Sequence, residues 1–470
     1  MQEVDIAASP VDRFGGVLPR DDMTRFTTAA TDAAARLTGH HLWHINSTAE
    51  GGGVAEMLQS ILGYLKGCDV PVRWLVINGN EDFFVVTKRL HHLLHGRPGD
   101  GGPLGDAERK VYESALAGEL PALLDLVEAG DVAVLHDPQT LGLAPALAEA
   151  GVELIWACHI GADEADDHTR LAWEFLAPYT AHTRRQVFSR RQYAWEVLDP
   201  AEVAVIPPCI DAFSAKNEPL DDDAIRAILD AAGVIPDPAA TADPTYVARD
   251  GRSGQVSHRA TMIEEEATPA DAAVVLQVSR WDPLKDHVGV MAGFCEHGPD
   301  SAHLILAGPD PDSVSDDPEG KESLDELTGA WRDLPAEQRR RVHIACLPMD
   351  DVDENAAVVN ALQRHATVVV QKSLAEGFGL TVAEAMWKAR PVVGSRVGGI
   401  QDQIEDDVSG VLVDPTDLAM FGKAVAELLD DPDRASEMGR RAHDRACRRY
   451  LAPCHLTHYL ELITGPGTGG

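Results

Sequence analysis

Two glutamates flank a glycine-rich turn in the second half of the chain, which reads Glu-Gly-Phe-Gly-Leu-Thr-Val-Ala-Glu from Glu376 to Glu384. A β-branched run over 367–371 precedes the turn and a helix over about 380–389 follows it, so the order is strand, loop and helix. The amino end of a helix presents free backbone N–H groups and a partial positive charge, and glycines let a ligand approach closely. The pattern is typical of a sugar-diphosphate site, although a solvated acidic loop would contain the same glutamates.

Two cations follow another predicted strand, at 274–278. Arg280 comes just after this strand and Lys285 follows in the same loop. A planar guanidinium binds phosphate oxygens in pairs and an ammonium acts as a mobile point charge, with each charge-assisted contact contributing about 1.5–3 kcal/mol. The two side chains are therefore candidates for holding a diphosphate. Surface ion pairs with Asp282 and Asp286 are the alternative interpretation.

The first half contains a second glycine run between a predicted strand and a predicted helix. The strand covers 42–46, the glycines are Gly51, Gly52 and Gly53, and apolar residues over 54–65 follow the i, i+3, i+4 spacing of a buried helix face. The glycines do not have the Gly-x-Gly-x-x-Gly spacing of a dinucleotide site, which argues against NAD. A plain flexible turn explains them equally well.

Histidines stand at the ends of two predicted strands in the first half. His136, which is followed by Asp137, and His159 are placed to hydrogen-bond sugar hydroxyls. Lys88 and His92, on an amphipathic segment, are weaker candidates for an acceptor site. A buried structural histidine and a solvated helix face are the corresponding alternatives.

Composition excludes several classes of protein. The chain has 76 acidic and 40 basic residues and a net charge of −36, which opposes binding to nucleic acid or an anionic membrane. No apolar run approaches the roughly 18 residues of a membrane-spanning helix, and the acidic amino end lacks the apolar core of a secretion signal, so we expect a cytoplasmic protein. The seven cysteines form no Cys-x-x-Cys pair and are expected to act as small buried apolar residues.

Short apolar runs alternate with helical stretches along the whole chain. This alternation predicts parallel sheets covered on both faces, and the length of 470 residues suits two such domains. We therefore expect an α/β protein with two doubly wound Rossmann-like domains facing across a cleft, and ligands at the carboxyl ends of the strands. The predicted strands are 41–46, 72–77, 132–136, 153–157 and 203–206 in the first half, and 274–278, 303–307, 342–346, 367–371, 392–394 and 411–413 in the second.

Domain boundaries follow from the local composition. The Pro207-Pro208 pair marks the exit from the first domain, so we expect domains at 1–212 and 213–450. A stretch rich in Asp, Ala, Pro and Gly over 236–268 is expected to be an inserted, exposed loop. Helical periodicity returns in the last segment, 451–470, before a glycine-rich tail.

Several longer motifs point to a known family. These are Asn46-Ser-Thr-Ala-Glu-Gly-Gly-Gly-Val-Ala-Glu-Met-Leu-Gln, Leu135-His-Asp-Pro-Gln-Thr, Ile206-Pro-Pro-Cys-Ile-Asp and Glu384-Ala-Met-Trp-Lys. With the glycine turns and the two cations, they resemble the retaining nucleotide-sugar glycosyltransferases of the GT-B fold in family 4, and specifically the trehalose synthase branch. The resemblance covers about residues 10–455 and departs from the family pattern at 236–268.

The resemblance implies an enzyme that joins an NDP-glucose to free glucose and forms trehalose reversibly. Arg280 and Lys285 would stabilise the leaving diphosphate, Glu376 would contact sugar hydroxyls and Glu384 would hold the ribose. Arg280, Lys285 and Glu376 are the candidate catalytic residues. None is assigned as a nucleophile, and a covalent nucleophilic role for Glu376 is a minor alternative. The candidate donor-binding residues are Gly52, Gly53, His136, Arg280, Lys285, Gly377, Phe378, Gly379, Leu380 and Glu384, and the candidate acceptor-binding residues are Lys88, His92, Asp137 and His159. The helix at 451–470 would cross back to the first domain.

The resemblance also implies that neither a metal nor a cofactor takes part. The Asp-x-Asp strings at 310–312 and 351–353 come too late in the chain for a metal-dependent transferase motif. The expected partners are small molecules (NDP-glucose, glucose and trehalose), without nucleic acid or membrane, and a homodimer is possible. A trehalose phosphorylase or another retaining GT-B transferase is the near alternative, and a nucleotide-sugar epimerase or a non-catalytic sensor is the distant one.

Overall fold

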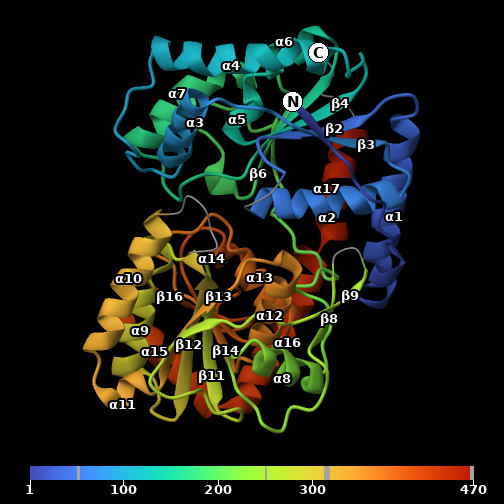
Figure 1. Ribbon diagram of the computed structural model, residues 1–470. Helices are drawn as coiled ribbons and strands as arrows, with labels where there is room; N and C mark the ends of the chain where they lie inside the picture. The colour runs from blue at the N-terminus through green and yellow to red at the C-terminus, as the bar shows by residue number, and fades with distance from the viewer. Residues whose placement is uncertain (50–52, 249–250, 312–317, 466–470) are drawn as a thin grey trace. The chain divides into compact units, whose positions relative to one another are not determined.

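The computed structural model describes residues 1–49, 53–248, 251–311 and 318–465. The chain forms two compact units, one made of Met1–Cys209 with Arg448–Gly470 and the other of Ile210–Cys447. Each unit contains a seven-stranded sheet whose central strands are buried along their length. Helices cover both faces of each sheet, as Figure 1 shows. The predicted α/β class with two doubly wound units is thereby confirmed.

The N-terminal unit has the strand order β1-β3-β2-β4-β5-β6-β7, with every neighbouring pair parallel except β1 and β3. Its strands are β1 Gln2–Val4, β2 Leu42–Asn46, β3 Val72–Val76, β4 Val132–His136, β5 Glu153–Cys158, β6 Arg185–Phe188 and β7 Val203–Val205. Its helices are α1 Arg20–Arg36, α2 Gly53–Gly67, α3 Glu81–Leu94, α4 Asp106–Leu124, α5 Asp137–Leu141, α6 Ala144–Glu149, α7 Asp167–Thr180 and α17 Ala452–Thr464. The last helix packs against the first and the second.

The C-terminal unit has the order β10-β13-β12-β11-β14-β15-β16, and only β10 is antiparallel to its neighbour. The strands are β10 Thr261–Ile263, β11 Ala273–Val278, β12 Ala302–Pro309, β13 Val342–Leu347, β14 Val368–Gln371, β15 Val392–Ser395 and β16 Val411–Val413. The helices are α8 Asp222–Ala231, α9 His287–His297, α10 Pro318–Asp333, α11 Ala336–Arg339, α12 Val352–His365, α13 Leu380–Trp387, α14 Ile400–Gln403, α15 Leu418–Asp430 and α16 Pro432–Arg449.

The stretch 236–268, expected to be a loop, contains three short strands. Two of them, β8 Thr245–Val247 and β9 Ser253–Gln255, form an antiparallel hairpin, and the third is the edge strand β10. The Glu354 carboxylate on α12 accepts hydrogen bonds from the backbone N–H groups of Ser257 and His258, both at 2.6 Å. These contacts tie the stretch to the second unit.

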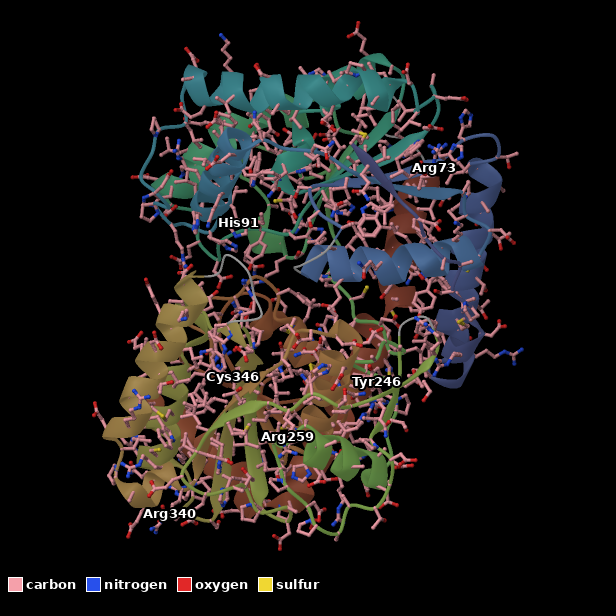
Figure 2. The ribbon with its side chains drawn as sticks, in the orientation of Figure 1. Arg73, His91, Tyr246, Arg259, Arg340 and Cys346 are labelled. Carbon is pink, nitrogen blue, oxygen red and sulfur yellow. The ribbon has the colours of Figure 1, made fainter. Side chains whose placement is uncertain are left out.

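In each sheet, the carboxyl ends of the parallel strands lie together at one edge of that sheet. In Figure 2, Arg340 lies at the amino end of β13 and Cys346 lies near its carboxyl end, which gives the direction of the second sheet. Ligand sites in doubly wound sheets lie at the carboxyl edge. The loops after β11 and β14, which contain the predicted cations and the glycine turn, lie at this edge. Across the described residues, no helix is both long enough and apolar enough to cross a membrane.

Candidate active site

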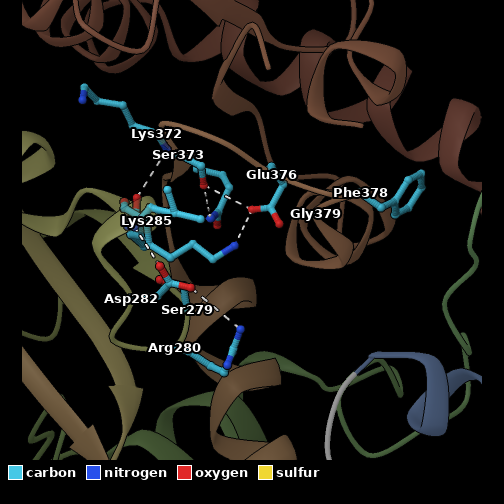
Figure 3. A network of polar contacts seen from close by, with 12 residues as sticks. Ser279, Arg280, Asp282, Lys285, Lys372, Ser373, Glu376, Phe378 and Gly379 are labelled. Carbon is cyan, nitrogen blue, oxygen red and sulfur yellow. Dashed lines mark hydrogen bonds and ion pairs between the residues drawn. The ribbon is translucent and has the colours of Figure 1, made fainter. Parts of the chain in front are cut away.

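Lys285 and Glu376 form an ion pair at the carboxyl edge of the C-terminal sheet. The Lys285 Nζ lies 2.5 Å from the Glu376 Oε2, and their side chains are only 15% and 11% exposed (Figure 3). The Ser373 hydroxyl donates to the same carboxylate oxygen at 3.2 Å, and Gln371 Nε2 donates to Ser373 Oγ at 3.0 Å. The structure therefore joins a predicted phosphate-binding cation directly to a predicted sugar-binding carboxylate.

The loop after β11 is folded so that Lys285 ends a short 3₁₀ turn, Pro283–Lys285. The Asp282 side chain caps this turn by accepting from the Leu284 N–H at 2.8 Å. The Leu284 carbonyl in turn accepts from the Leu374 N–H at 2.7 Å, which connects the loops after β11 and β14. The sequence puts almost ninety residues between these loops, and the sheet brings them together because β11 and β14 are neighbours.

Arg280 behaves differently from Lys285. Its side chain is 73% exposed, and its guanidinium lies 3.8 Å from the Asp282 carboxylate (Figure 3). The surface pair with Asp282, the alternative interpretation from the sequence, is present for Arg280. Lys285 pairs with Glu376 instead of with Asp286. An exposed ion pair of this length is weak, so the guanidinium can move to an incoming anion at little cost.

The glycine turn before α13 is held in place by the short helix α14. Gly379 has φ 83° and ψ 63°, a left-handed conformation that glycine adopts without strain, and it caps α13 at Leu380. Gln403 Nε2 donates to the carbonyls of Phe378, at 2.5 Å, and Gly379, at 3.2 Å. The Gly377 carbonyl accepts from the Gly399 N–H at 3.0 Å. The Phe378 ring is buried and points away from the Lys285–Glu376 pair (Figure 3).

Glu384 is buried on α13, and both of its carboxylate oxygens have partners. Gln363 Nε2 donates to Oε2 at 3.2 Å, and the Lys216 Nζ lies 3.7 Å from Oε1. Lys388 Nζ, also buried, donates at 2.7 Å both to Gln363 Oε1 and to Asn217 Oδ1. Burial lowers the pKa of Lys388 well below its usual value. Sequence reasoning missed Lys216, Gln363 and Lys388, and the only local signal was the i, i+4 spacing of Glu384 and Lys388.

The carboxyl end of α13 is fastened to both segments near the points where the chain passes between the two units. Trp387 Nε1 donates to the Asn217 carbonyl at 3.0 Å, shortly after the chain enters the second unit at Ile210. His443 Nδ1 donates to the Trp387 carbonyl at 2.6 Å, and the two rings stack 4.9 Å apart, shortly before the chain leaves at Cys447.

A stack of three histidines crosses the N-terminal sheet, with His44 in the middle of β2, His136 at the carboxyl end of β4 and His159 just after β5. His44 Nδ1 lies 3.0 Å from His136 Nε2, and His136 Nδ1 lies 3.4 Å from His159 Nε2. The ring planes of neighbouring members are inclined by 25° and 8°. Burial, helped by His455 nearby, lowers the pKa of His44 to about 3, and burial also lowers that of His136 well below its usual value. These two rings are therefore neutral at physiological pH.

Asp137 and His455 border this stack. Asp137 has φ 59°, and its Oδ1 accepts from the His159 N–H at 2.8 Å, while burial raises the pKa of its carboxyl. His455 on α17 donates from Nδ1 to the Pro207 carbonyl at 2.8 Å. It lines a small, largely apolar cavity together with His44 and His136. Sequence reasoning missed His44 and His455 because neither position shows a pattern typical of function.

The remaining predicted site residues are not part of these clusters. Gly52 lies outside the described residues, and Gly53 is the exposed first residue of α2. Lys88 is exposed on α3 and His92 is half-buried beside His91, and no contact described for residues 53–248 links either side chain to the histidine stack. Asp351, from one of the Asp-x-Asp strings, caps α12 by accepting from the N–H groups of Asp353 and Glu354, which is a structural role.

Comparison with solved structures identifies the class of fold. A trehalose-phosphate synthase (UDP-forming) from Burkholderia vietnamiensis superimposes with a TM-score of 0.64 at 17% sequence identity, covering 90% of this chain and 98% of that one. This likeness shows the GT-B fold of glycosyltransferases, as the motifs predicted.

Sequence comparison identifies the family. The model for the trehalose synthase N-terminal domain matches residues 44–195, and that for group 1 glycosyl transferases matches residues 258–445. Trehalose synthases from Rubrobacter xylanophilus and Pyrococcus horikoshii are 33% identical over 444 residues and 31% identical over 440 residues, covering 92–93% of this chain and 92% of theirs. The chain belongs to the trehalose synthase family of retaining group 1 glycosyltransferases, which confirms the resemblance seen in the motifs.

Proposed function

We propose that this protein is a retaining glucosyltransferase that forms trehalose from NDP-glucose and glucose, reversibly. The observation that supports the proposal is the Lys285–Glu376 ion pair, in which a cation meets the carboxylate predicted to bind sugar hydroxyls, in the loop that leads into α13. Its family relatives named trehalose synthases support the choice of substrates.

In the proposed reaction, the bond between the glucose C1 and the diphosphate oxygen breaks, and negative charge develops on the leaving NDP. Lys285 would leave Glu376 and pair with the diphosphate. Arg280 would leave its weak pair with Asp282 and also bind the diphosphate. Preorganised cations that meet developing charge lower the barrier to reaction, and one such contact typically changes kcat by about 10²–10³-fold. The N–H groups at the start of α13 would add their partial positive charge.

The carboxylates have separate roles in this proposal. Glu376, released by Lys285, would accept hydrogen bonds from hydroxyls of the transferred glucose, and Glu384 would accept those of the ribose. The acceptor hydroxyl would attack from the face of the departing diphosphate, and its proton would pass to a donor phosphate oxygen. We propose that cations and helix N–H groups replace a metal in this reaction, so that EDTA would leave the rate unchanged.

We propose that residues 213–450 bind the donor and that residues 1–212 bind the acceptor glucose. Asp137 and His159 are the best candidates for the acceptor, and Lys88 and His92 are weaker ones. Both ring nitrogens of His136 already face other histidines, so we assign it to orienting His159. Neutral polar groups suit an uncharged sugar because they offer hydrogen bonds without the cost of burying a charge.

The test is to incubate purified protein with UDP-, ADP- or GDP-glucose and to identify the disaccharide by NMR. We expect α,α-linked trehalose, with NDP released only when free glucose is present. Cleavage of trehalose by phosphate without any nucleotide would favour a phosphorylase instead. Inversion at C2 of a UDP-amino sugar would favour an epimerase. Tight nucleotide-sugar binding without turnover would favour a non-catalytic sensor.

A further inference from the structure

Lys372 carries a buried ammonium that the proposed reaction does not use. It follows β14, its side chain is 1% exposed, and its Nζ pairs with the Asp286 Oδ2. Figure 3 shows the Lys372 side chain directed away from the Lys285–Glu376 pair. The loops after β11 and β14 are thus joined by two ion pairs, in which each loop supplies one lysine and one carboxylate.

Stability alone does not explain a buried ion pair. Removing two charges from water is costly, and well-packed apolar residues often replace such pairs without loss of stability. Removing only one partner, in contrast, leaves an uncompensated charge. The position of the Lys372–Asp286 pair, next to the lysine of the candidate site, suggests a reason for it.

Asp286 is the residue directly after Lys285, and its conformation is unusual. It has φ 50° and ψ 48°, a left-handed conformation that is uncommon for residues other than glycine. Its Oδ1 accepts from the Gly289 N–H at 3.2 Å, so the carboxylate caps α9 while it binds Lys372. A Cβ at Gly289 would lie 2.2 Å from the Asp286 carboxylate, so a larger residue there would require the carboxylate to move from this position.

Gln277 provides a second connection between Lys372 and Lys285. Its Nε2 donates to the Lys285 carbonyl at 2.8 Å, and its Oε1 accepts from the Lys372 N–H at 3.4 Å. The Gln277 side chain is fully buried at the end of β11. The backbone of Lys285 is therefore held on one side through Gln277 and on the other through Asp286, and both supports end at Lys372.

We propose that the Lys372–Asp286 pair is a positioning device that presents the Lys285 ammonium to the donor diphosphate. This inference rests on the proposed role of Lys285. None of the contacts described for residues 251–311 and 318–465 joins Lys372 or Asp286 to Glu376, so we expect the pair to act through the backbone of Lys285 and not on the substrate. When Lys285 exchanges Glu376 for the diphosphate, the buried pair stays formed and keeps the loop in place.

The experiment compares single and double variants. Asp286→Asn keeps the helix cap and tolerates the left-handed conformation, so it removes the charge alone. Lys372→Met keeps the length of the side chain. We expect each to lower kcat about 10–100-fold with a smaller change in the KM for the donor, because misplacing a group by about 1 Å can lower a rate about 100-fold. In a Lys285→Ala background, Lys372→Met should lower kcat less than about 3-fold further, because the group being positioned is gone.

Equal losses of kcat from Lys372→Met in both backgrounds would overturn the proposal, as would wild-type kcat in a folded Lys372→Met protein. If Lys372→Met does not fold, the Lys372→Met/Asp286→Asn double variant removes both charges and replaces it in the cycle. Arg226→Met is the matched control because it breaks another ion pair of the same unit, with Asp237, and should leave kcat unchanged.

A binding measurement separates this proposal from the proposed function. Calorimetry with UDP, ADP and GDP measures nucleotide affinity in the same variants and needs no turnover. For the nucleotide that binds most tightly, Lys372→Met should weaken the affinity when Lys285 is present and leave the affinity unchanged in the Lys285→Ala background. If the wild-type protein makes no trehalose, the proposed function fails and this comparison still decides the positioning role. Equal weakening in both backgrounds would overturn it.

Discussion

The polar clusters of the two units differ in charge: one consists of charged pairs and the other contains neutral rings. In the C-terminal unit, the cluster consists of charges in close pairs, Lys285 with Glu376 and Lys372 with Asp286. In the N-terminal unit, it consists of the stacked rings of His44, His136 and His159, and burial keeps the first two neutral. A diphosphate needs positive charge, whereas a free sugar needs only hydrogen-bonding groups. The difference fits a division into a donor-binding and an acceptor-binding unit.

The largest expected effect comes from removing the cation of the C-terminal cluster. Lys285→Ala should lower kcat at least about 100-fold, because it removes one contact to charge that develops in the transition state. Thermal melting should show that the variant stays folded. Unchanged kinetics would contradict the role of Lys285 and the contrast between the two units.

Glu384→Ala should act on nucleotide binding more than on turnover. We expect about a 10–30-fold weaker NDP affinity by calorimetry, since hydrogen bonds to a charged group contribute about 1.5–3 kcal/mol and solvent replaces part of that contribution. Glu384→Gln is the matched control that keeps the hydrogen-bonding shape without the charge. Wild-type affinity in the alanine variant would count against the ribose role.

His159→Ala tests the same division of roles from the side of the N-terminal unit. The variant should raise the KM for glucose about 5–10-fold, the scale of one neutral hydrogen bond, and leave NDP affinity unchanged. Steady-state kinetics with varied glucose, together with calorimetry, measures both. A change in NDP affinity without a change in the KM for glucose would reverse the proposed division of roles.

The histidines also make stability depend on pH. The folded-state pKa values of His44 and His455, about 3 and about 4, lie below the ordinary value near 6.5, mainly because of burial. Between pH 6.5 and about 4 the unfolded chain therefore binds more protons than the folded one, so the free energy of unfolding falls as pH falls through this window. Differential scanning calorimetry should show Tm falling from pH 6.5 to 4, and a flat Tm would contradict the neutral stack.

The sequence was sufficient for the fold and for part of the candidate site. Alternating strands and helices predicted both sheets, and the glycine turn and Lys285 were found from residue type and spacing. The edge strands β1 and β10 were missed because both are partly exposed and begin with polar residues, so neither forms the continuous apolar run that identified the equally short strands β7 and β16. The partners of Glu384 were missed because Lys216 meets it through folding of distant segments, which no local spacing reveals.

Arg280 and Lys372 show a second limit on what the sequence alone can predict. Residue type indicated a role for the exposed Arg280, whereas nothing in the string around Lys372 indicated that its ammonium would be buried. Charge in a sequence identifies candidates for binding an anion. Which of them the fold immobilises depends on neighbouring strands, here β11 and β14.

The helix α13 is only eight residues long, with the glycine turn at one end and Trp387 at the other. If a helix this short tilted as one piece at Gly379, Trp387 would shift and would take its hydrogen-bond partners Asn217 and His443 with it. We expect a nucleotide bound at the turn to slow hydrogen–deuterium exchange in the connecting stretches 210–218 and 443–449. Identical exchange with and without nucleotide would show that binding at the turn does not affect these stretches through α13.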